Sequence, residues 1–390
     1  MRKFWRSWKS GTGNSGEGMS IYWNARTRQL QPYIPGEQPK DRKFIKLNTN
    51  ENPYPPSPLV IEAIQKAADD RLRLYPDPSC MELREAAAAR YGVGTEQVFA
   101  GNGSDEILAF AFAAFFGRKK EGDDNCLFFP DITYSFYPVY ADLWGIPFRT
   151  IPLEPDFSID ISKYIEVMSL GQAGGIIFPN PNAPTGIAIP LEELKKTAEA
   201  AWRNKLVLVV DEAYIAFADA EGVSAAIPLI KNYPNLLIVR TLSKEASLAG
   251  LRVGFAMGSE ELIEGLCKVR DSFNSYTLDR LALAGASAAL KDAAYYDEMN
   301  KKVIATRCRV ALSLEALGFR ILQSQANFVF AAPPENCGRS GQEFFAALRE
   351  FGILTRHFNK PRIAEFLRIS MGTDDEMDIL LEACTKIIGH

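Results

Sequence analysis

Residues 236–255, with the sequence LLIVRTLSKEASLAGLRVGF, constrain the fold more than any other stretch. The apolar, β-branched-rich run from Leu236 to Val239 is typical of a buried strand. The run leads to Lys244, which follows two hydroxyl residues, and Arg252 comes a few positions later. Most lysines are solvated at the protein surface. A lysine at the end of an interior strand therefore indicates a functional site only together with a second observation.

That observation is an acidic residue at the end of another apolar run. LVLVV at residues 206–210 is followed directly by Asp211, and Tyr214 comes three positions later. The interval between Asp211 and Lys244 suits a crossover connection between two parallel strands. Both side chains are then expected at the same carboxyl edge of one sheet. The pattern predicts an α/β fold with a functional site at that edge.

An amine and a carboxylate at one sheet edge match what pyridoxal phosphate requires. The cofactor needs an amine that bonds its aldehyde carbon and a carboxylate that keeps its ring nitrogen protonated, so that the ring can accept electrons from a substrate carbanion. Lys244 and Asp211 are the residue types for these two tasks. The stretch resembles the lysine segment of the fold-type I aminotransferases, and most closely that of the histidinol-phosphate aminotransferase family.

Composition and residue usage exclude several other classes of protein. Basic side chains number 44 and acidic ones 48, so nothing favours nucleic acid or an anionic membrane surface as a partner. No apolar run approaches the roughly 18–20 residues of a membrane span. Six scattered cysteines without a C-x-x-C pair, together with only two histidines, argue against a metal site and a disulfide framework. They fit a reducing cytoplasm.

The resemblance covers about residues 40–385 and implies an α/β fold of aminotransferase fold type I. Its large domain has a mostly parallel seven-stranded sheet between helices, and its smaller domain is α+β. The first residues end in a Gly/Ser/Asn-rich stretch typical of a flexible extension, and long Ala-rich helical stretches mark the passage to the smaller domain. The expected division is an extension at 1–18, an N-terminal arm packing with the small domain at 19–49, a large cofactor-binding domain at 50–275 and a small domain at 276–390.

A glycine-rich loop before an apolar helix resembles the family's G-N-G-S-D-E motif, and the resemblance implies that it binds the cofactor phosphate. In GNGSDEILAFAFAAFF, Gly103 and the N-cap candidates Ser104 and Asp105 lie where the loop enters the helix. Free N–H groups and the positive end of the helix dipole favour an anion there. Ser243 and Arg252 are expected to complete the site, because an arginine fork pairs with two phosphate oxygens at once.

The resemblance implies further contacts with the cofactor ring. Tyr134 is expected to lie flat against the ring, with Tyr137 as the competing candidate. The Tyr214 hydroxyl is expected to hydrogen-bond the ring oxygen. The family's usual N-N-P-T-G motif is altered here to N-A-P-T-G, so the asparagine that donates to the ring oxygen is expected to be Asn182, and Asn180 stays an alternative.

Other residues matched by the resemblance concern the substrate and a partner subunit. Arg368 and Arg356 are expected to bind the anionic end of the substrate, and Asn50 and Asn52 to face it. Tyr75, in a Y-P-D-P turn, is expected to reach the cofactor phosphate of a neighbouring subunit. In this interpretation a homodimer is required for function.

The expected activity is amino transfer from histidinol phosphate to 2-oxoglutarate, giving imidazole-acetol phosphate and glutamate, in a cytoplasmic enzyme of histidine biosynthesis. An aminotransferase for aromatic or other amino acids and a threonine-phosphate decarboxylase-like enzyme share nearly every motif. A pyridoxal-phosphate-binding regulatory domain is disfavoured, because the first 40 residues are too short and irregular for a DNA-binding module. A nicotinamide dehydrogenase is disfavoured because no G-x-G-x-x-G opens a βαβ unit.

Overall fold

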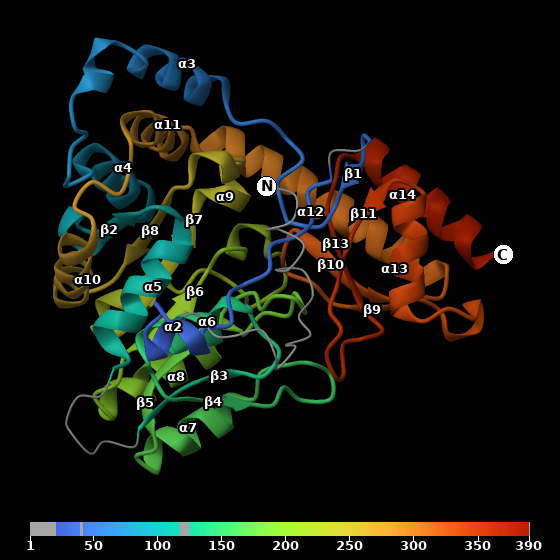
Figure 1. Ribbon diagram of the computed structural model, residues 1–390, viewed down its shortest axis with the longest axis horizontal. Coiled ribbons are helices and arrows are strands. Elements are labelled where there is room, and N and C mark those ends of the chain that lie inside the picture. Colours follow the sequence, from blue (N-terminus) through green and yellow to red (C-terminus); the bar gives the residue numbers. More distant parts are fainter. Residues whose placement is uncertain (1–20, 40–41, 118–124, 390) are drawn as a thin grey trace.

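The largest unit of the molecule is a sheet of seven strands between helices (Figure 1). The computed structural model describes residues 21–39, 42–117 and 125–389. In the sheet order β2-β8-β7-β6-β5-β3-β4, only β8 runs antiparallel to its neighbours. The predicted mostly parallel, seven-stranded α/β architecture is confirmed. The strands are β2 (Val98–Gly101), β3 (Cys126–Pro130), β4 (Phe148–Ile151), β5 (Ala173–Pro179), β6 (Leu208–Asp211), β7 (Leu236–Thr241) and β8 (Gly254–Met257).

Helices cover both faces of this sheet, which explains the continuous apolar runs of its central strands. Every residue of β6 and β7 is buried. Alternate residues enter separate cores, with Val209 and Val239 in one and Val210 and Ile238 in the other. The first core is covered by α5 (Gly103–Phe115), α6 (Phe136–Trp144) and α10 (Glu260–Phe273), and the second by α3 (Pro58–Ala67), α4 (Met81–Tyr91), α7 (Ile161–Ser169), α8 (Leu191–Arg203) and α11 (Arg280–Lys291).

The carboxyl ends of β6 and β7 place the two central side chains of the sequence prediction. Asp211 is the last residue of β6 and pairs in parallel register with Val239 of β7. β7 ends at Thr241, whose hydroxyl accepts the backbone N–H of Ser243 and so caps the short helix α9 (Leu242–Glu245). Asp211 and Lys244 therefore emerge at the same edge of the sheet, as the crossover spacing predicts.

A second, smaller group of strands and helices contains the C-terminal part of the chain. The N-terminal arm joins it, because β1 (Ile45–Lys46) pairs in parallel with β11 (Ile353–Leu354). A four-stranded antiparallel sheet has the order β12-β13-β10-β9. Its elements are β9 (Arg320–Leu322), β10 (Phe328–Ala332), β12 (Arg356–His357) and β13 (Leu367–Ser370), with α12 (Ala293–Ala316), α13 (Gly341–Glu350) and α14 (Asp374–Ile388) around them.

Packing at the passage between the two units bears on the expected domain division. Helix α11 follows the expected boundary at residue 276, yet it packs against α3 and α4 of the large unit. The long helix α12 then leads into the small unit, where Val303, Val310 and Leu314 join its core. The boundaries stay a prediction, and the extension expected at residues 1–18 lies outside the described residues.

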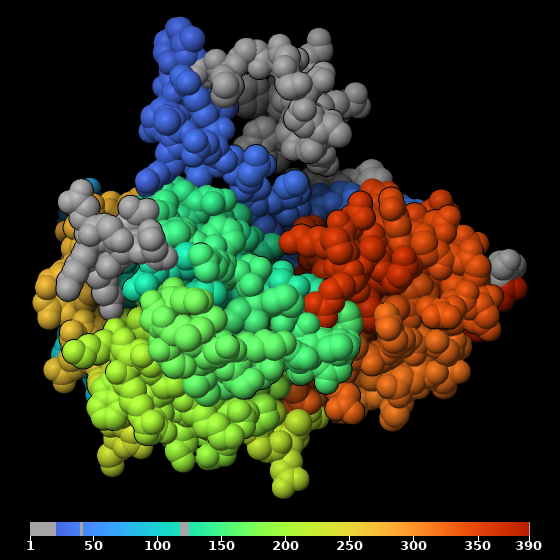
Figure 2. Space-filling view, turned by 90° about the horizontal axis from the view of Figure 1, so that it is seen from below, coloured from blue at the N-terminus to red at the C-terminus, as the bar shows by residue number. Residues whose placement is uncertain are grey.

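The N-terminal segment that the structure describes crosses the outside of the molecule. It includes α2 (Ala25–Gln29), and Figure 2 shows this blue segment standing off the body and then descending towards the join between the green and red parts. Short 3-10 helices are η1 (Asp70–Arg73), η2 (Thr95–Gln97), η3 (Ile215–Phe217), η4 (Ile227–Lys231), η5 (Ala249–Leu251) and η6 (Glu335–Cys337). Among the helices of the described ranges, none combines the length and the apolar character needed to span a lipid bilayer.

Candidate active site

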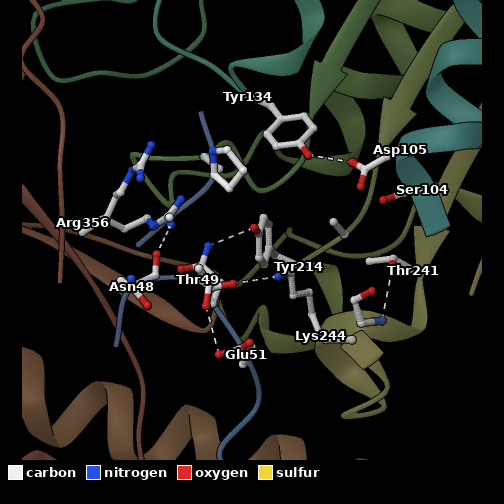
Figure 3. A pocket seen from close by; sticks show the side chains of 18 of the residues that line it. Asn48, Thr49, Glu51, Ser104, Asp105, Tyr134, Tyr214, Thr241, Lys244 and Arg356 are labelled. Carbon is white, nitrogen blue, oxygen red and sulfur yellow. Dashed lines mark hydrogen bonds between the residues drawn. The ribbon is translucent and has the colours of Figure 1, made fainter. Parts of the chain in front are cut away.

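A cavity of about 280 Å³ lies at the carboxyl edge of the large sheet, and both units contribute to its wall (Figure 3). The large unit supplies the lysine and the aspartate at the ends of β7 and β6, and the small unit supplies two arginines. The structure thus brings most of the predicted residues together. Those that line the cavity are Lys244, Asp211, Tyr214, Tyr134, Ser104, Asp105, Ser243, Arg252, Arg356, Arg368 and Asn50.

The amine of Lys244 is held at the cavity wall by a single backbone acceptor. Its Nζ donates to the Thr49 carbonyl at 3.0 Å, and the Asn52 amide donates to the Lys244 carbonyl at 3.0 Å. Part of the side chain faces the cavity, but the amine is largely removed from bulk water. This burial, reinforced by the positive charge of Arg368, lowers the pKa of Lys244 to about 8. The neutral, nucleophilic form is therefore accessible near neutral pH.

Asp211 is a buried carboxylate without a cationic partner in the described parts of the chain. It is 5% exposed, and it accepts hydrogen bonds from the Tyr137 hydroxyl and the Ala213 N–H, each at 3.2 Å. Burial raises the pKa of Asp211 to about 7. A buried charge of this kind is costly unless a cation pairs with it. The protonated ring nitrogen of pyridoxal phosphate would supply such a cation, so the buried Asp211 fits this cofactor.

The start of α5 and Arg252 form a second polar region of the wall. Arg252 Nη2 lies 2.9 Å from Asp105 Oδ2, and its Nη1 lies 3.5 Å from the Ser243 hydroxyl. Gly103, at φ +76°, does not line the cavity, but a Cβ there would come within 2.6 Å of the Arg252 guanidinium. Glycine at this position therefore allows the arginine to approach the N–H groups at the start of α5. These donors suit a phosphate.

Two tyrosines compete for the role of ring-stacking residue, and the structure separates them. Tyr134 lines the cavity, and its hydroxyl donates to Asp105 Oδ1 at 2.7 Å. Tyr137 is fully buried and donates to Asp211, so it holds the carboxylate in place. This placement favours Tyr134 as the ring contact. The third tyrosine, Tyr214, accepts a hydrogen bond from the Asn50 amide at 2.9 Å (Figure 3).

Three asparagines differ from their expected placement. The Asn182 amide nitrogen, expected to donate to the ring oxygen, instead donates to the Ile132 carbonyl at 2.9 Å, and Asn182 does not line the cavity. The alternative, Asn180, is engaged with the backbone of Ile189 at both ends of its amide. Asn52, expected to contact substrate, binds the Lys244 carbonyl instead. Backbone carbonyls and N–H groups nearby thus occupy the polar atoms of all three side chains, apart from the buried Asn182 Oδ1, which lacks a partner.

Tyr75 lies away from the cavity of its own chain. It is 78% exposed, and its ring stacks on Tyr276 with centroids 4.5 Å apart. A role at the cofactor of the same subunit is excluded by this placement. The role across a subunit interface stays a prediction.

Several cavity residues have no signal in the sequence prediction. Tyr33 stacks on Phe136, with ring centroids 4.2 Å apart, and reaches the cavity from the N-terminal arm. The local sequence around Tyr33 does not indicate a place in the cavity. The arm is positioned by long-range contacts, such as the hydrogen bond from Arg356 to the Ile34 carbonyl. Of the cavity residues without an expected role, Thr241 could have been recognised from the sequence, because a threonine two positions before Ser243 is a typical N-cap. The others that line the cavity include Asn48, Thr49 and Glu51.

The fold and the cavity define a transaminase. The chain belongs to the aminotransferase class I and II family, whose model matches residues 42–384. Pyridoxal phosphate is the cofactor of this class, so the prediction of a pyridoxal-phosphate-dependent aminotransferase is confirmed.

Individual relatives carry a more specific name. The histidinol-phosphate aminotransferase of Clostridium acetobutylicum is 52% identical over 95% of this chain and 100% of its own length. Histidinol-phosphate aminotransferase 1 of Bordetella parapertussis is 53% identical over 95% of this chain and 99% of its own. The crystal structure of histidinol-phosphate aminotransferase from Sinorhizobium meliloti, in complex with pyridoxal-5'-phosphate, has a TM-score of 0.83 at 25% identity and covers 95% of this chain and 98% of that one.

Proposed function

We propose that this aminotransferase moves the amino group of histidinol phosphate to 2-oxoglutarate, as an enzyme of histidine biosynthesis. The observation that supports it most is a pair of arginines in one wall of the cavity. Arg356 of β12 and Arg368 of β13 are direct cross-strand partners. Like charges directly opposite each other destabilise a sheet. An anion bound between them removes that repulsion, and a phosphate dianion does so better than a single carboxylate.

Further contacts of the two arginines fit an anion site. Arg368 Nη2 donates to the Asn48 carbonyl at 2.9 Å, but its buried Nε has no partner. Burial, with Arg356 as a further contributor, lowers the pKa of Arg368. A bound phosphate would give the Arg368 Nε an acceptor and would stabilise the charged form of the guanidinium. The names of the relatives at 52% and 53% identity support the same substrate.

The chain's own groups suit the proton transfers of this reaction. When bound, pyridoxal phosphate supplies an aldehyde carbon that exchanges an amino group and a ring that accepts electrons. Asp211 is placed to keep a ring nitrogen protonated, while Ser104, Ser243 and Arg252 are placed to hold the phosphate. The Lys244 amine, in its neutral form, takes the proton from the substrate Cα and returns it to a neighbouring carbon as a general acid. 2-Oxoglutarate would then accept the amino group in the second half of the cycle.

Replacing either arginine with glutamine is expected to lower kcat/KM for histidinol phosphate by about 10–100-fold, because each hydrogen-bonded charge contributes about 1.5–3 kcal/mol. Cofactor binding should not change, since neither side chain belongs to the expected phosphate site of the cofactor. The measurement is steady-state glutamate formation with histidinol phosphate. Arg320→Gln, an exposed arginine of β9 in the same sheet, is the matched control.

Rates with other donors decide between the candidate substrates. Faster turnover of phenylalanine than of histidinol phosphate would show an aromatic aminotransferase. Release of CO₂ in place of glutamate formation would show a decarboxylase. Equal kcat/KM for the Arg356→Gln, Arg368→Gln and Arg320→Gln variants would remove the arginine pair as the anion site.

We also propose a homodimer in which Tyr75 reaches the neighbouring subunit. Support comes from large apolar side chains that are exposed, since such surfaces in soluble proteins mark interaction sites. They lie on α3, on and directly after η1, at the start of α4, and at or shortly after the end of α10, where Tyr276 stacks on Tyr75. The residues are Leu59, Ile61, Leu72, Leu74, Met81, Phe273 and Tyr276.

Leu72→Asp combined with Leu74→Asp is expected to convert the protein from a dimer to a 43.3 kDa monomer and to weaken cofactor binding. A buried unpaired charge in an interface costs several kcal/mol. Sedimentation equilibrium and cofactor titration measure the two effects. Leu170→Asp, at an equally exposed leucine that ends α7, is the control. A monomeric wild-type chain with tightly bound cofactor would contradict the proposal.

The cytoplasm is the proposed location. Cys80, Cys267, Cys308, Cys337 and Cys384 are free thiols. Unpaired thiols are typical of reducing compartments.

A further inference from the structure

A cluster of buried charge lies on the face of the sheet opposite to Asp211. Arg240 of β7 is 5% exposed, and its Nη2 donates to Glu245 Oε2 at 2.5 Å. Its Nη1 lies 3.5 Å from Oε2 of Glu212, which is 1% exposed. The Tyr91 ring lies 5.0 Å from the guanidinium, and the Tyr91 hydroxyl donates to Glu245 Oε1 at 3.3 Å. One arginine thus joins a buried acid, Glu212, to Glu245, whose side chain is 12% exposed.

The two acids are the immediate neighbours of the two residues that serve the cofactor ring. Glu212 follows Asp211, and Glu245 follows Lys244. Because side chains alternate along a strand, Glu212 points to the opposite face from Asp211. Arg240 shares that face, since its neighbour Val239 packs in the core on the α5 side. A single guanidinium therefore bridges the segments of Asp211 and Lys244 from behind the cavity.

The backbone alone does not provide this link. The ladder between β6 and β7 ends with the hydrogen bond from the Glu212 N–H to the Val239 carbonyl at 2.8 Å. Beyond that point β7 turns into α9, which contains Lys244. Among the described residues, the Arg240 fork provides the ion pairs between the start of the loop after β6 and the end of α9.

The energetics do not favour such a cluster for stability alone. Each buried ion costs several kcal/mol in lost hydration, and well-packed apolar groups often serve stability equally well. A planar guanidinium that donates a hydrogen bond to Glu245 and forms an ion pair with Glu212 at 3.5 Å does provide a defined geometry, which a lysine cannot reproduce. Glu212 also accepts the Ala226 N–H at 2.6 Å, which anchors one end of the link in the large unit.

We propose that Arg240 is a positioning residue of the transamination reaction, which holds α9 against the end of β6 and thereby fixes the Lys244 amine relative to Asp211. The proposal rests on the proposed function, since it concerns the same site. Displacement of a reacting group by about 1 Å can lower a rate about 10²-fold. The link between Glu212 and Glu245 prevents that displacement.

The test uses Arg240→Lys in the holoenzyme, because lysine keeps the charge but cannot span both acids. The expected results are stoichiometric cofactor, a shift of about one pH unit in the midpoint of the bound cofactor's absorbance titration, and a kcat about 10²-fold lower with KM within about threefold. Because lysine keeps the positive charge of Arg240, a shift of the midpoint reports a displacement of Lys244 relative to Asp211. Arg84→Lys is the matched control: its side chain is 13% exposed and its fork bonds the Val98 and Thr95 carbonyls at 2.9 Å, away from the cavity.

A second pair of variants keeps the test open if Arg240→Lys does not fold. Glu245→Ala removes one end of the link and should shift the titration as Arg240→Lys does, whereas Glu245→Gln, whose side-chain oxygen still accepts from Arg240, should shift it less. A wild-type midpoint and wild-type kcat in Arg240→Lys or Glu245→Ala would overturn the proposal. A lower melting temperature with an unchanged midpoint, as expected for Arg84→Lys, would also overturn it, because it would show a purely structural role.

The same measurements separate this proposal from the proposed function. The absorbance titration needs no amino donor, so its outcome does not depend on histidinol phosphate being the substrate. Failure of the wild type to convert histidinol phosphate would remove the proposed function. Failure of the variants to shift the midpoint would remove only the role of Arg240.

Discussion

Lys244→Ala is expected to abolish covalent attachment of pyridoxal phosphate and to lower the transamination rate by at least about 10²–10⁴-fold, the usual contribution of a positioned general base. No other amine of the described residues lines the cavity. Absorbance spectra of the bound cofactor and single-turnover kinetics with histidinol phosphate measure the two losses. Lys268→Ala, at an exposed lysine paired with Glu264, should change neither.

The pKa of Lys244 adds a pH dependence to this expectation. Because that pKa is lowered to about 8, half of the amine is neutral at that pH in the cofactor-free chain. Acylation of Lys244, followed by peptide mass, should therefore rise with pH around a midpoint near 8, whereas an exposed lysine should rise near its ordinary value of about 10.4. Full turnover by Lys244→Ala, or acylation of Lys244 with the midpoint of an exposed lysine, would refute the assignment.

Asp211→Asn is expected to change activity and stability in opposite directions. The rate should fall by about 10²–10³-fold, as when a preorganised electrostatic partner is removed. The cofactor-free chain should become more stable at pH 8. The folded state raises the pKa of Asp211 from 3.8 to about 7, so ionisation disfavours folding, and stability is lost as the pH rises through this window. A shift of that size corresponds to about 4 kcal/mol at most.

Thermal unfolding of the cofactor-free chain at pH 5 and pH 8 measures this effect. The difference in melting temperature between wild type and Asp211→Asn should be clearly larger at pH 8 than at pH 5. Asp297→Asn, a surface carboxylate paired with Arg90, should show no such difference. An unchanged transamination rate in Asp211→Asn would mean that another group serves the ring nitrogen, and equal melting temperatures at pH 8 would mean that the carboxylate is not strained by burial.

Local patterns predicted the parts of the fold and site that depend on neighbouring residues. The apolar runs before Asp211 and Lys244 became β6 and β7, and the crossover spacing placed both residues at one edge. One of the long Ala-rich helical stretches expected at the passage to the smaller domain is the helix Ala293–Ala316. These features follow from periodicity, which acts over a few residues.

Features that depend on long-range contacts could not be predicted from local sequence patterns. The Asn182 amide binds the Ile132 carbonyl, 50 positions away in the chain, which no local motif encodes. Asn52 binds the Lys244 carbonyl across an even longer interval. The arm that contains Tyr33 is held at the cavity by hydrogen bonds from Arg356 and Asn48 to its carbonyls. The tertiary structure thus decides which polar atoms of a motif are available to a ligand.

The course of the N-terminal arm has a practical consequence for protein production. Tyr33, Gly36 and Gln38 form part of the cavity wall, although the family model begins only at residue 42. A recombinant protein trimmed to the boundaries of that model loses this part of the cavity wall. Expression plasmids for inhibitor screening should therefore encode the arm in full.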